Sequence, residues 1–221
     1  MRVEWYGQSA FRLEADGLTV FIDPFGDMSS LAGRGIEWNY PPIEGVGADL
    51  LLVTHEHRDH NAVEAIEGEP HVIRALAGTH ESPAGTVVGV SSEHDPVAGT
   101  QRGHNTIFVF ELGGVRVAHF GDFGQSALRD EQAEAIGTVD LALIPVGGGP
   151  TIGAEQGQAV AERIGARWIV PHHYRTERIS FLEPVDELLS RYENVRRLDT
   201  PRFDTAELPK DAPLVVVPAA P

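Results

Sequence analysis

Short apolar stretches, many of them alternating with polar residues, recur along the chain and predict more strands than helices. Strands are expected at residues 3–6, 10–15, 18–22, 49–54, 71–75, 86–90, 106–112, 115–120, 141–146, 168–170, 195–198 and 214–217. Helices are expected at residues 62–66, where Asn61 would be the N-cap, and at 129–136, 154–164 and 184–192. The pattern therefore predicts a protein built mainly on sheets, with helices between some strands.

Residues 25–47 show neither the strand period nor the helix period. They are rich in Gly and Pro and carry Trp38 and Tyr40. A loop of this length in a compact domain is usually functional or mobile. We expect a lid or a substrate wall, and plain disorder is the alternative.

A dense polar run follows directly on the apolar strand at 49–54. Its order is His55-Glu56-His57-Arg58-Asp59-His60. In an extended segment His55 and His57 point the same way, and a later turn would bring Asp59 and His60 round to them. Imidazole and carboxylate ligands suit a borderline divalent metal such as zinc, and this run holds enough for two neighbouring sites. The alternative is a polar surface loop, which the buried strand before it disfavours.

Other predicted strands also end in residues that suit a metal. His94 lies in a polar turn beyond one strand, Asp122 follows another between two glycines, and His172 and His173 follow a third. Asp23 also ends a strand. It is expected either to cap a turn or to hydrogen-bond a metal-ligating histidine.

Composition narrows the chemistry of the chain. Its 221 residues suit one large domain or two small ones, and a formal net charge of −16 disfavours a broad nucleic-acid-binding face. There is no cysteine, so disulfides and thiolate ligands are excluded. No apolar run approaches the ~20 residues that a membrane span needs, and the N-terminus lacks the apolar core of a signal peptide. We expect a soluble, cytoplasmic protein.

Residues 147–151 form a glycine loop between a predicted strand and a predicted helix, an arrangement also used to bind phosphate. The loop lacks the Gly-Lys-Ser/Thr ending of a nucleotide-binding loop, which disfavours ATP or GTP. A simple turn and an anion pocket for substrate are both open.

The histidine run, the later histidine, the Gly-Asp after a hairpin and the final histidine after a strand together resemble the metallo-β-lactamase superfamily. Within it, the chain resembles the branch of L-ascorbate-6-phosphate lactonase and related metal-dependent hydrolases. Further local matches are residues 5–11, 22–25, 102–106, 119–122 and 171–174. The resemblance covers nearly the whole chain. It indicates the fold and a metal site more strongly than a substrate, because the superfamily hosts many reactions.

The resemblance implies an α/β fold of the four-layer αβ/βα sandwich type, with two mixed sheets flanked by helices. A single domain over residues 1–221 is expected, with pseudo-equivalent halves at about 1–105 and 106–221. The resemblance also implies two divalent metal ions. Zinc is the favoured metal, and manganese and iron are alternatives.

The same resemblance assigns the ligands. It implies His55, His57 and His94 for the first ion, Asp59, His60 and His173 for the second, and Asp122 as the bridge. His94 is preferred to His104 for its strand-end position beside Asp95. His173 is preferred to His172 because the family pattern places its histidine directly before tyrosine.

These roles imply a hydrolase in which a metal-bridging hydroxide cleaves a small ester, lactone or phosphoester. Asp59, as an acid, and His119 are the candidate catalytic residues. The candidate substrate contacts are Arg102, Asn105, Thr151, Tyr174 and Arg175. Relatives often carry histidine where this chain has Gln8, so the role of that position is open.

Three further functions fit the same residues less well. The first is a nuclease or small-nucleotide phosphodiesterase, for which the acidic composition disfavours long substrates. The second is a metal-binding protein of the same fold without catalysis. The third is a redox role with a di-iron centre, since His and Asp ligands suit iron as well as zinc. The expected partner is a small-molecule substrate, and a homo-oligomer is open.

Overall fold

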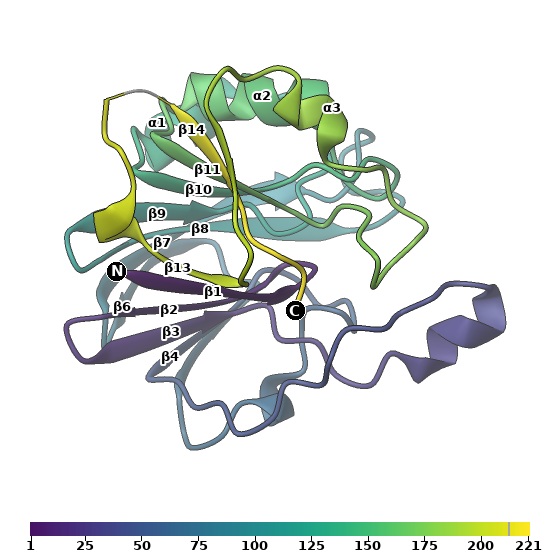
Figure 1. Cartoon of the computed structure of the whole chain (residues 1–221). Coiled ribbons are helices and arrows are strands. Elements are labelled where there is room, and N and C mark those ends of the chain that lie inside the picture. The colour runs from purple at the N-terminus through teal and green to yellow at the C-terminus, as the bar shows by residue number, and fades with distance from the viewer. Residues whose placement is uncertain (212) are drawn as a thin grey trace.

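The computed structural model describes residues 1–211 and 213–221, which form two packed, mixed β-sheets (Figure 1). The strands of the smaller sheet are β1 (Arg2–Gly7), β2 (Ala10–Ala15), β3 (Leu18–Ile22), β4 (Leu50–Val53), β5 (His71–Arg74) and β13 (Arg202–Asp204). Those of the larger sheet are β6 (Gly78–Ser82), β7 (Gly85–Glu93), β8 (His104–Leu112), β9 (Val115–His119), β10 (Leu141–Pro145), β11 (Trp168–His172), β12 (Val195–Arg197) and β14 (Leu214–Val217). Their orders are β13-β1-β2-β3-β4-β5 and β12-β14-β11-β10-β9-β8-β7-β6. The expected fold class is confirmed.

The main apolar core joins the two sheets. Trp5 and Phe11 from the smaller sheet and Phe108 and Phe110 from the larger sheet belong to one cluster of buried side chains. Side chains alternate across a strand, so residues such as Phe21 face the opposite way and pack in a second cluster. The strands are thereby held firmly enough to fix the positions of the loops at their ends.

Helices cover the outer face of the larger sheet (Figure 1). They are α1 (Asp130–Ile136), α2 (Ala154–Arg163) and α3 (Asp186–Leu189). The outer face of the smaller sheet packs against loop residues, including Tyr40 and Val46. The described residues also form three short 3₁₀ helices, namely η1 (Ser29–Arg34), η2 (Val63–Ala65) and η3 (Thr205–Glu207). Among the described residues, no helix combines the length and apolarity that crossing a membrane requires.

Two expected helices differ from the observed ones. The segment expected to be helical at 62–66 is only the 3₁₀ turn η2, and Asn61 does not cap it. The Asn61 side chain instead donates from Nδ2 to the Glu56 carbonyl at 3.0 Å, within the histidine run. The helix expected at 184–192 is the shorter α3.

Two strands were absent from the prediction, and both lie at sheet edges. β6 reads Gly-Thr-His-Glu-Ser and has no apolar face from which a strand could be predicted. β13 has only three residues and pairs antiparallel with β1. Residue 105 is the expected boundary between the two halves of the chain. β6 and β7 lie before it but belong to the larger sheet, and β13 lies after it but belongs to the smaller sheet, so each sheet contains strands from both halves.

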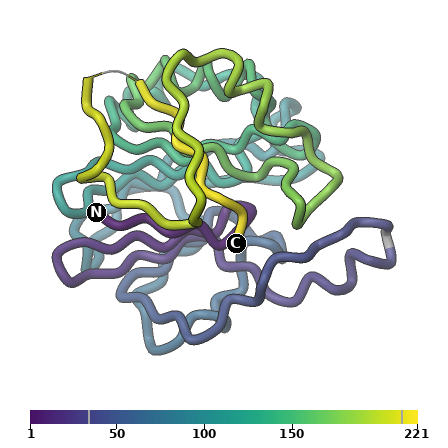
Figure 2. Tube along the Cα trace, viewed as in Figure 1, coloured from purple at the N-terminus to yellow at the C-terminus, as the bar shows by residue number. Residues whose placement is uncertain are grey.

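The middle of the loop at 25–47 reaches away from the two sheets as an arm (Figure 2), while its ends pack against the smaller sheet. Its returning part is tied to a neighbouring segment, because Asn39 N–H donates to the Arg178 carbonyl at 2.8 Å. The Tyr40 hydroxyl also hydrogen-bonds the Thr176 hydroxyl at 3.0 Å. Plain disorder therefore does not describe this part of the loop. Its action as a lid stays a prediction.

Candidate metal centre

Residues that follow four different strands converge in one place. The strands are β4, β7, β9 and β11. The first group of side chains is His55, His57 and His94, and the second is Asp59, His60, Asp122 and His173. Within each group the candidate ligand atoms lie within 4.8 Å of one another. The structure thus brings together all seven side chains expected to hold metal.

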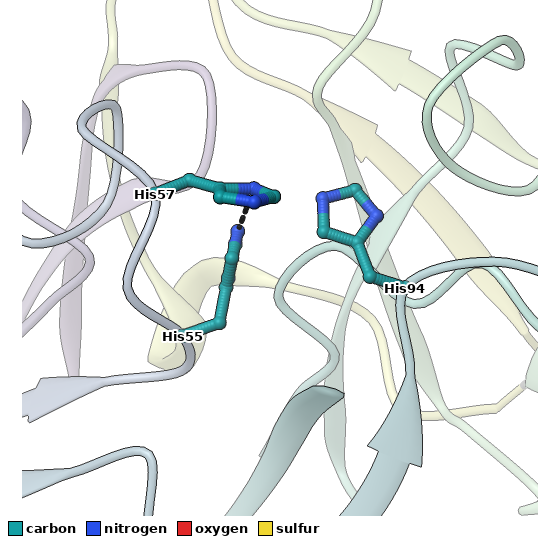
Figure 3. A group of neighbouring side chains, drawn as sticks. All are labelled: His55, His57 and His94. Atoms are coloured by element: carbon teal, nitrogen blue, oxygen red, sulfur yellow. Dashed lines mark hydrogen bonds between the residues drawn. The ribbon is translucent and has the colours of Figure 1, made fainter. Parts of the chain in front are cut away.

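The first group joins the two sheets of the sandwich (Figure 3). His55 and His57 come from the loop after β4, and His94 comes from the end of β7. His55 Nε2 lies 3.0 Å from His57 Nδ1. His55 and His94 are buried, whereas His57 is exposed, so the group opens to solvent on the His57 side.

The sequence predicts an extended segment at residues 55–57, just after β4. In the structure this segment is bent. The later turn, expected to bring Asp59 and His60 round, is present, because His60 N–H donates to the His57 carbonyl at 2.9 Å. His55 and His57 therefore meet through the bend at residues 55–57, and not because side chains alternate along a strand.

Asp122 belongs to the second group and also faces the first. Its Oδ2 is 3.0 Å from His94 Nε2 in the first group and 3.4 Å from His173 Nε2 in the second. Its Oδ1 is 3.3 Å from His60 Nε2. One carboxylate thus faces ligands of both groups, as a bridging residue must.

Asp23 holds His60 from behind, which is one of the two roles that the sequence left open for it. Asp23 is fully buried, and its Oδ2 accepts from His60 Nδ1 at 2.9 Å. Its two oxygens also accept from the Thr54 N–H and hydroxyl, both at 2.7 Å. With Nδ1 engaged in this way, His60 presents Nε2 to the cluster.

The carboxylates and histidines of the second group shift one another's pKa values. Burial by itself would raise the pKa of Asp122, but the surrounding histidines, His173 foremost, lower it well below its ordinary value. Burial would lower the pKa of His60, but the surrounding carboxylates, Asp122 foremost, raise it well above its ordinary value. A proton on His60 therefore balances negative charge that a metal cation would otherwise balance.

The donor set fits divalent metal ions. His60 Nε2 is buried and makes no hydrogen bond within the described part of the chain, so a cation replacing its proton would give it a partner. Burial lowers the pKa of His55 well below its ordinary value, which keeps that imidazole in the neutral form that metals bind. Nitrogen and oxygen donors without sulfur suit zinc, manganese or iron.

The loop after His94 is wound around one carboxylate. Asp95 is buried and accepts backbone N–H bonds from Val97, Gly99, Gln101 and Arg102, at 2.7 to 3.0 Å. This fixes the loop that starts at His94. His104, the alternative ligand, is exposed and lies outside both groups.

Glycines beside the ligands allow close backbone approach. A Cβ at Gly121 would lie 2.5 Å from Asn105 Oδ1, and one at Gly124 would lie 2.5 Å from the His94 backbone. A Cβ at Gly147 would collide with the His173 carbonyl. Three ligand-bearing turns therefore depend on the absence of a side chain.

The expected substrate contacts separate into buried and exposed residues. Asn105 Nδ2 donates to the Ser92 hydroxyl and the Phe120 carbonyl, and its Oδ1 accepts from Asp122 N–H at 3.0 Å. Its amide is thus used to position Asp122, and this corrects the expected substrate contact. Arg102 and Arg175 are exposed, and their contact with substrate stays a prediction.

Thr151 and Tyr174 also have roles inside the protein. The Thr151 hydroxyl bonds to carbonyl groups of its own loop. Tyr174 is 4% exposed and stacks on Trp5 with ring centroids 5.5 Å apart. Burial raises the pKa of Tyr174 well above its ordinary value, so it stays a neutral packing residue. Neither side chain is placed to meet a substrate.

The glycine loop at 147–151 is a turn rather than an anion pocket. It closes on itself, since Thr151 N–H donates to the Gly148 carbonyl at 3.0 Å. A Cβ at Gly148 would lie 2.5 Å from the Glu183 carboxylate. That negative charge beside the loop disfavours an anion.

His119 is fully buried, and its ring is hydrogen-bonded within the protein. Gly121 N–H donates to its Nδ1 at 2.8 Å, and its Nε2 then donates to the Ser9 carbonyl at 2.9 Å. Both ring nitrogens are thus bonded to backbone, and burial lowers the pKa of the imidazole. The catalytic role expected for His119 is replaced by a structural one.

The lowered pKa of His119 predicts a pH dependence of stability. The unfolded chain takes up this proton below about pH 6.5 and the folded chain takes it up at lower pH, so stability falls as the pH drops. Metal-free wild type should therefore lose up to about 1.4 kcal/mol per pH unit more than His119→Gln at pH values about one unit or more below 6.5. Urea unfolding at several pH values measures this difference. Parallel pH profiles would contradict it.

Buried polar residues beneath the metal ligands could hardly be recognised from the sequence. Ser9 and His172 contact each other under Asp122, and Ser9 stands out in the sequence only as part of the match at residues 5–11. Gln8 is fully buried, and neither its amide nitrogen nor its amide oxygen has a hydrogen-bond partner among the described residues.

The fold and this site together define an α/β sandwich protein with a histidine and aspartate metal centre at its strand ends. A family model described as "Beta-lactamase superfamily domain" matches residues 2–173. A UPF0173 metal-dependent hydrolase of Thermus thermophilus is 31% identical over 201 residues, covering 80% of this chain and 84% of the relative. Another, from Thermococcus onnurineus, is 30% identical over 199 residues, covering 80% and 85%. The chain belongs to the metallo-β-lactamase superfamily.

Solved structures agree with this assignment. A protein of Thermotoga maritima, assigned as a Zn-dependent hydrolase of the metallo-β-lactamase superfamily, is 33% identical with a TM-score of 0.79, covering 98% of this chain and 97% of that one. An isothiocyanate hydrolase from Delia radicum gut bacteria has a TM-score of 0.69 at 17% identity over 99% and 96% of the chains, which shows the fold alone. The expected enzyme class, a hydrolase of this superfamily, is confirmed. The narrower resemblance to lactonases stays a prediction.

Proposed function

We propose that the protein is a binuclear metal-dependent hydrolase of small esters, lactones or phosphoesters. The position of Asp122 carries this proposal, because its Oδ2 faces His94 of the first group and its Oδ1 faces His60 of the second. Two separate groups that share one carboxylate suit a pair of neighbouring cations.

Each group would hold one divalent cation, with Asp122 shared. Metal ions held there would lower the pKa of a bound water, which would be the nucleophile, and would polarise the attacked carbonyl or phosphoryl oxygen. The opening beside His57 gives the substrate access. Zinc is the favoured metal, and manganese and iron fit the same donors.

Asp59 is the residue we propose for proton transfer. Its side chain is 23% exposed, unlike the buried Asp122, so it reaches the open side of the site. Burial would raise the pKa of Asp59, but His60 lowers it below its ordinary value. Asp59 is thus ionised at neutral pH. It can act as an acid towards the leaving group only after taking a proton from the attacking water.

The net charge of −16 supports a small substrate, because long polyanions would be repelled. A small-nucleotide phosphodiesterase would use the same residues and is the alternative activity. Metal binding without catalysis would also use these ligands, and so would redox chemistry at a di-iron centre. Metal analysis and a substrate panel distinguish both from hydrolysis.

Metal analysis followed by a substrate panel tests the proposal. Protein purified without added metal should contain about two zinc, manganese or iron ions per chain, with a lower content in His55→Ala. His104→Ala, which removes an exposed histidine outside the cluster, should match the wild type.

The panel should contain aryl esters, lactones, phosphodiesters and cyclic nucleotides. Hydrolysis abolished by a chelator and restored by metal is the expected result. Turnover of cyclic nucleotides alone would favour the phosphodiesterase activity. Two bound ions with no turnover would indicate binding without catalysis, and a coloured, iron-rich protein would indicate redox chemistry.

A further inference from the structure

A buried serine connects a second histidine to the shared carboxylate. The Ser9 hydroxyl lies 3.1 Å from His172 Nδ1 and 3.5 Å from Asp122 Oδ1. Ser9 and His172 are fully buried, and Asp122 is 2% exposed. The three side chains thus form a continuous polar contact beneath the metal-ligand cluster.

The chemistry of these groups fixes the direction of the hydrogen bonds. A carboxylate that binds a cation carries no proton, so Asp122 can only accept. The single hydroxyl proton of Ser9 therefore goes to Asp122. Ser9 Oγ then accepts, and His172 must donate from Nδ1.

The surroundings of His172 Nε2 also indicate that His172 donates from Nδ1. His172 Nε2 is buried and has no hydrogen-bond partner in the part of the chain that the structure describes. Burying an unpaired N–H is rarer in proteins than burying an unpaired acceptor. A proton on Nδ1 and a bare Nε2 is thus the tautomer that fits both ends of the ring.

Ser9 is held rigidly enough to direct Asp122. Its carbonyl accepts from His119 Nε2 at 2.9 Å. The preceding carbonyl, that of Gln8, accepts from Trp5 Nε1 at 2.9 Å and from His173 N–H at 3.3 Å. The turn between β1 and β2 is therefore fastened both to the core and to the ligand-bearing segment after β11.

We propose that His172 and Ser9 form a hydrogen-bond relay, from His172 Nδ1 through the Ser9 hydroxyl to Asp122 Oδ1, that orients the shared carboxylate for metal binding. Ser9 and His172 are thereby positioning residues, and His172 serves the site without being a ligand. This inference rests on the proposed function, because the relay can orient Asp122 for metal binding only if Asp122 binds metal.

Zinc affinity, measured by competition with a chromophoric chelator, tests the relay. Ser9→Ala should bind zinc about 10- to 100-fold more weakly than the wild type, the usual effect of losing a partner behind a ligand. Ser82→Ala, on the exposed edge strand β6, is the matched control and should match the wild type. Thermal unfolding of the metal-free proteins checks that each variant is folded.

Two variants of His172 add a readout that a merely structural role would not show. His172→Asn keeps an amide near the Nδ1 position and should retain wild-type affinity within about threefold. His172→Gln places its amide near the Nε2 position and should resemble Ser9→Ala. Adding Ser9→Ala to His172→Gln should cost nothing further, because both changes break one relay.

Nitrogen-15 chemical shifts of the His172 ring measure the direction itself. A protonated Nδ1 and an unprotonated Nε2 near neutral pH are expected in the zinc-bound protein. The opposite tautomer, or wild-type zinc affinity in Ser9→Ala, would overturn the relay while leaving the proposed function intact. Failure of the wild type itself to bind zinc, manganese or iron would overturn both.

Discussion

Replacing Asp122 with alanine should lower hydrolytic turnover by more than about 100-fold, because losing only a partner behind a ligand already costs ~10- to 100-fold. Asp122 is the one carboxylate within hydrogen-bonding distance of both His94 and His173 among the described residues. Its removal also leaves buried histidines without their negative partner. The bound metal should fall below that of the wild type, and both turnover and metal content measure the effect.

Asp199→Ala provides the control for Asp122→Ala, since it removes the same functional group from the exposed surface. It should leave turnover and metal content unchanged. Full turnover in Asp122→Ala would show that the shared carboxylate is dispensable, and the binuclear arrangement would then be wrong.

Replacing Gly147 with alanine should damage the site through the backbone. The new Cβ would collide with the His173 carbonyl and lie 2.9 Å from Tyr174 Cα, so the segment carrying His173 must move. Overpacking of this kind costs about 1–3 kcal/mol of unfolding free energy. A ligand displaced by even ~1 Å can lower turnover about 100-fold. Denaturant unfolding and steady-state kinetics measure the two effects.

Gly149→Ala separates this collision from general damage to the same loop. Gly149 has φ 57°, and among the described residues no other side chain or backbone lies within 4 Å of its added Cβ. Alanine there should cost ~1–2 kcal/mol of backbone strain and leave turnover within a few-fold of the wild type. Equal losses of turnover in the two variants would contradict the role assigned to Gly147.

Much of the site could be predicted because its residues lie at strand ends. A strand such as β4 is recognisable from its apolar run, and the residues that follow it are then placed at the edge of a sheet. The assignment of these residues to two metal ions came from the resemblance to the metallo-β-lactamase superfamily. The later turn from His57 to His60 was also expected, but the bend at residues 55–57 was not, because a bend in a polar run leaves no hydrophobic period to read.

The supporting layer was harder to predict. Asn105 and His119 have side chains that suit substrate binding or catalysis, but both are used inside the protein to hold the turn at Asp122. Their roles depend on contacts between strands far apart in the chain, and no local pattern reports such contacts. Ser9 and His172 are 163 residues apart and meet only in the folded chain.

Edge elements were missed for a related reason. β6 is polar on both faces, so its pairing with β7 is stabilised by backbone hydrogen bonds rather than by burial of its own side chains. The helix expected at 62–66 is lost because Asn61 binds back to the histidine run. In both places contacts with a neighbouring segment decide the structure, and hydrophobic periodicity does not report them.

In the proposed centre, two groups of ligands share Asp122. Anomalous diffraction from a crystal of the zinc-loaded protein, collected at the zinc edge, tests this arrangement most directly. We predict two peaks, one among His55, His57 and His94 and the other among Asp59, His60 and His173, with Asp122 between them. A single peak, or peaks outside this cluster, would contradict the account.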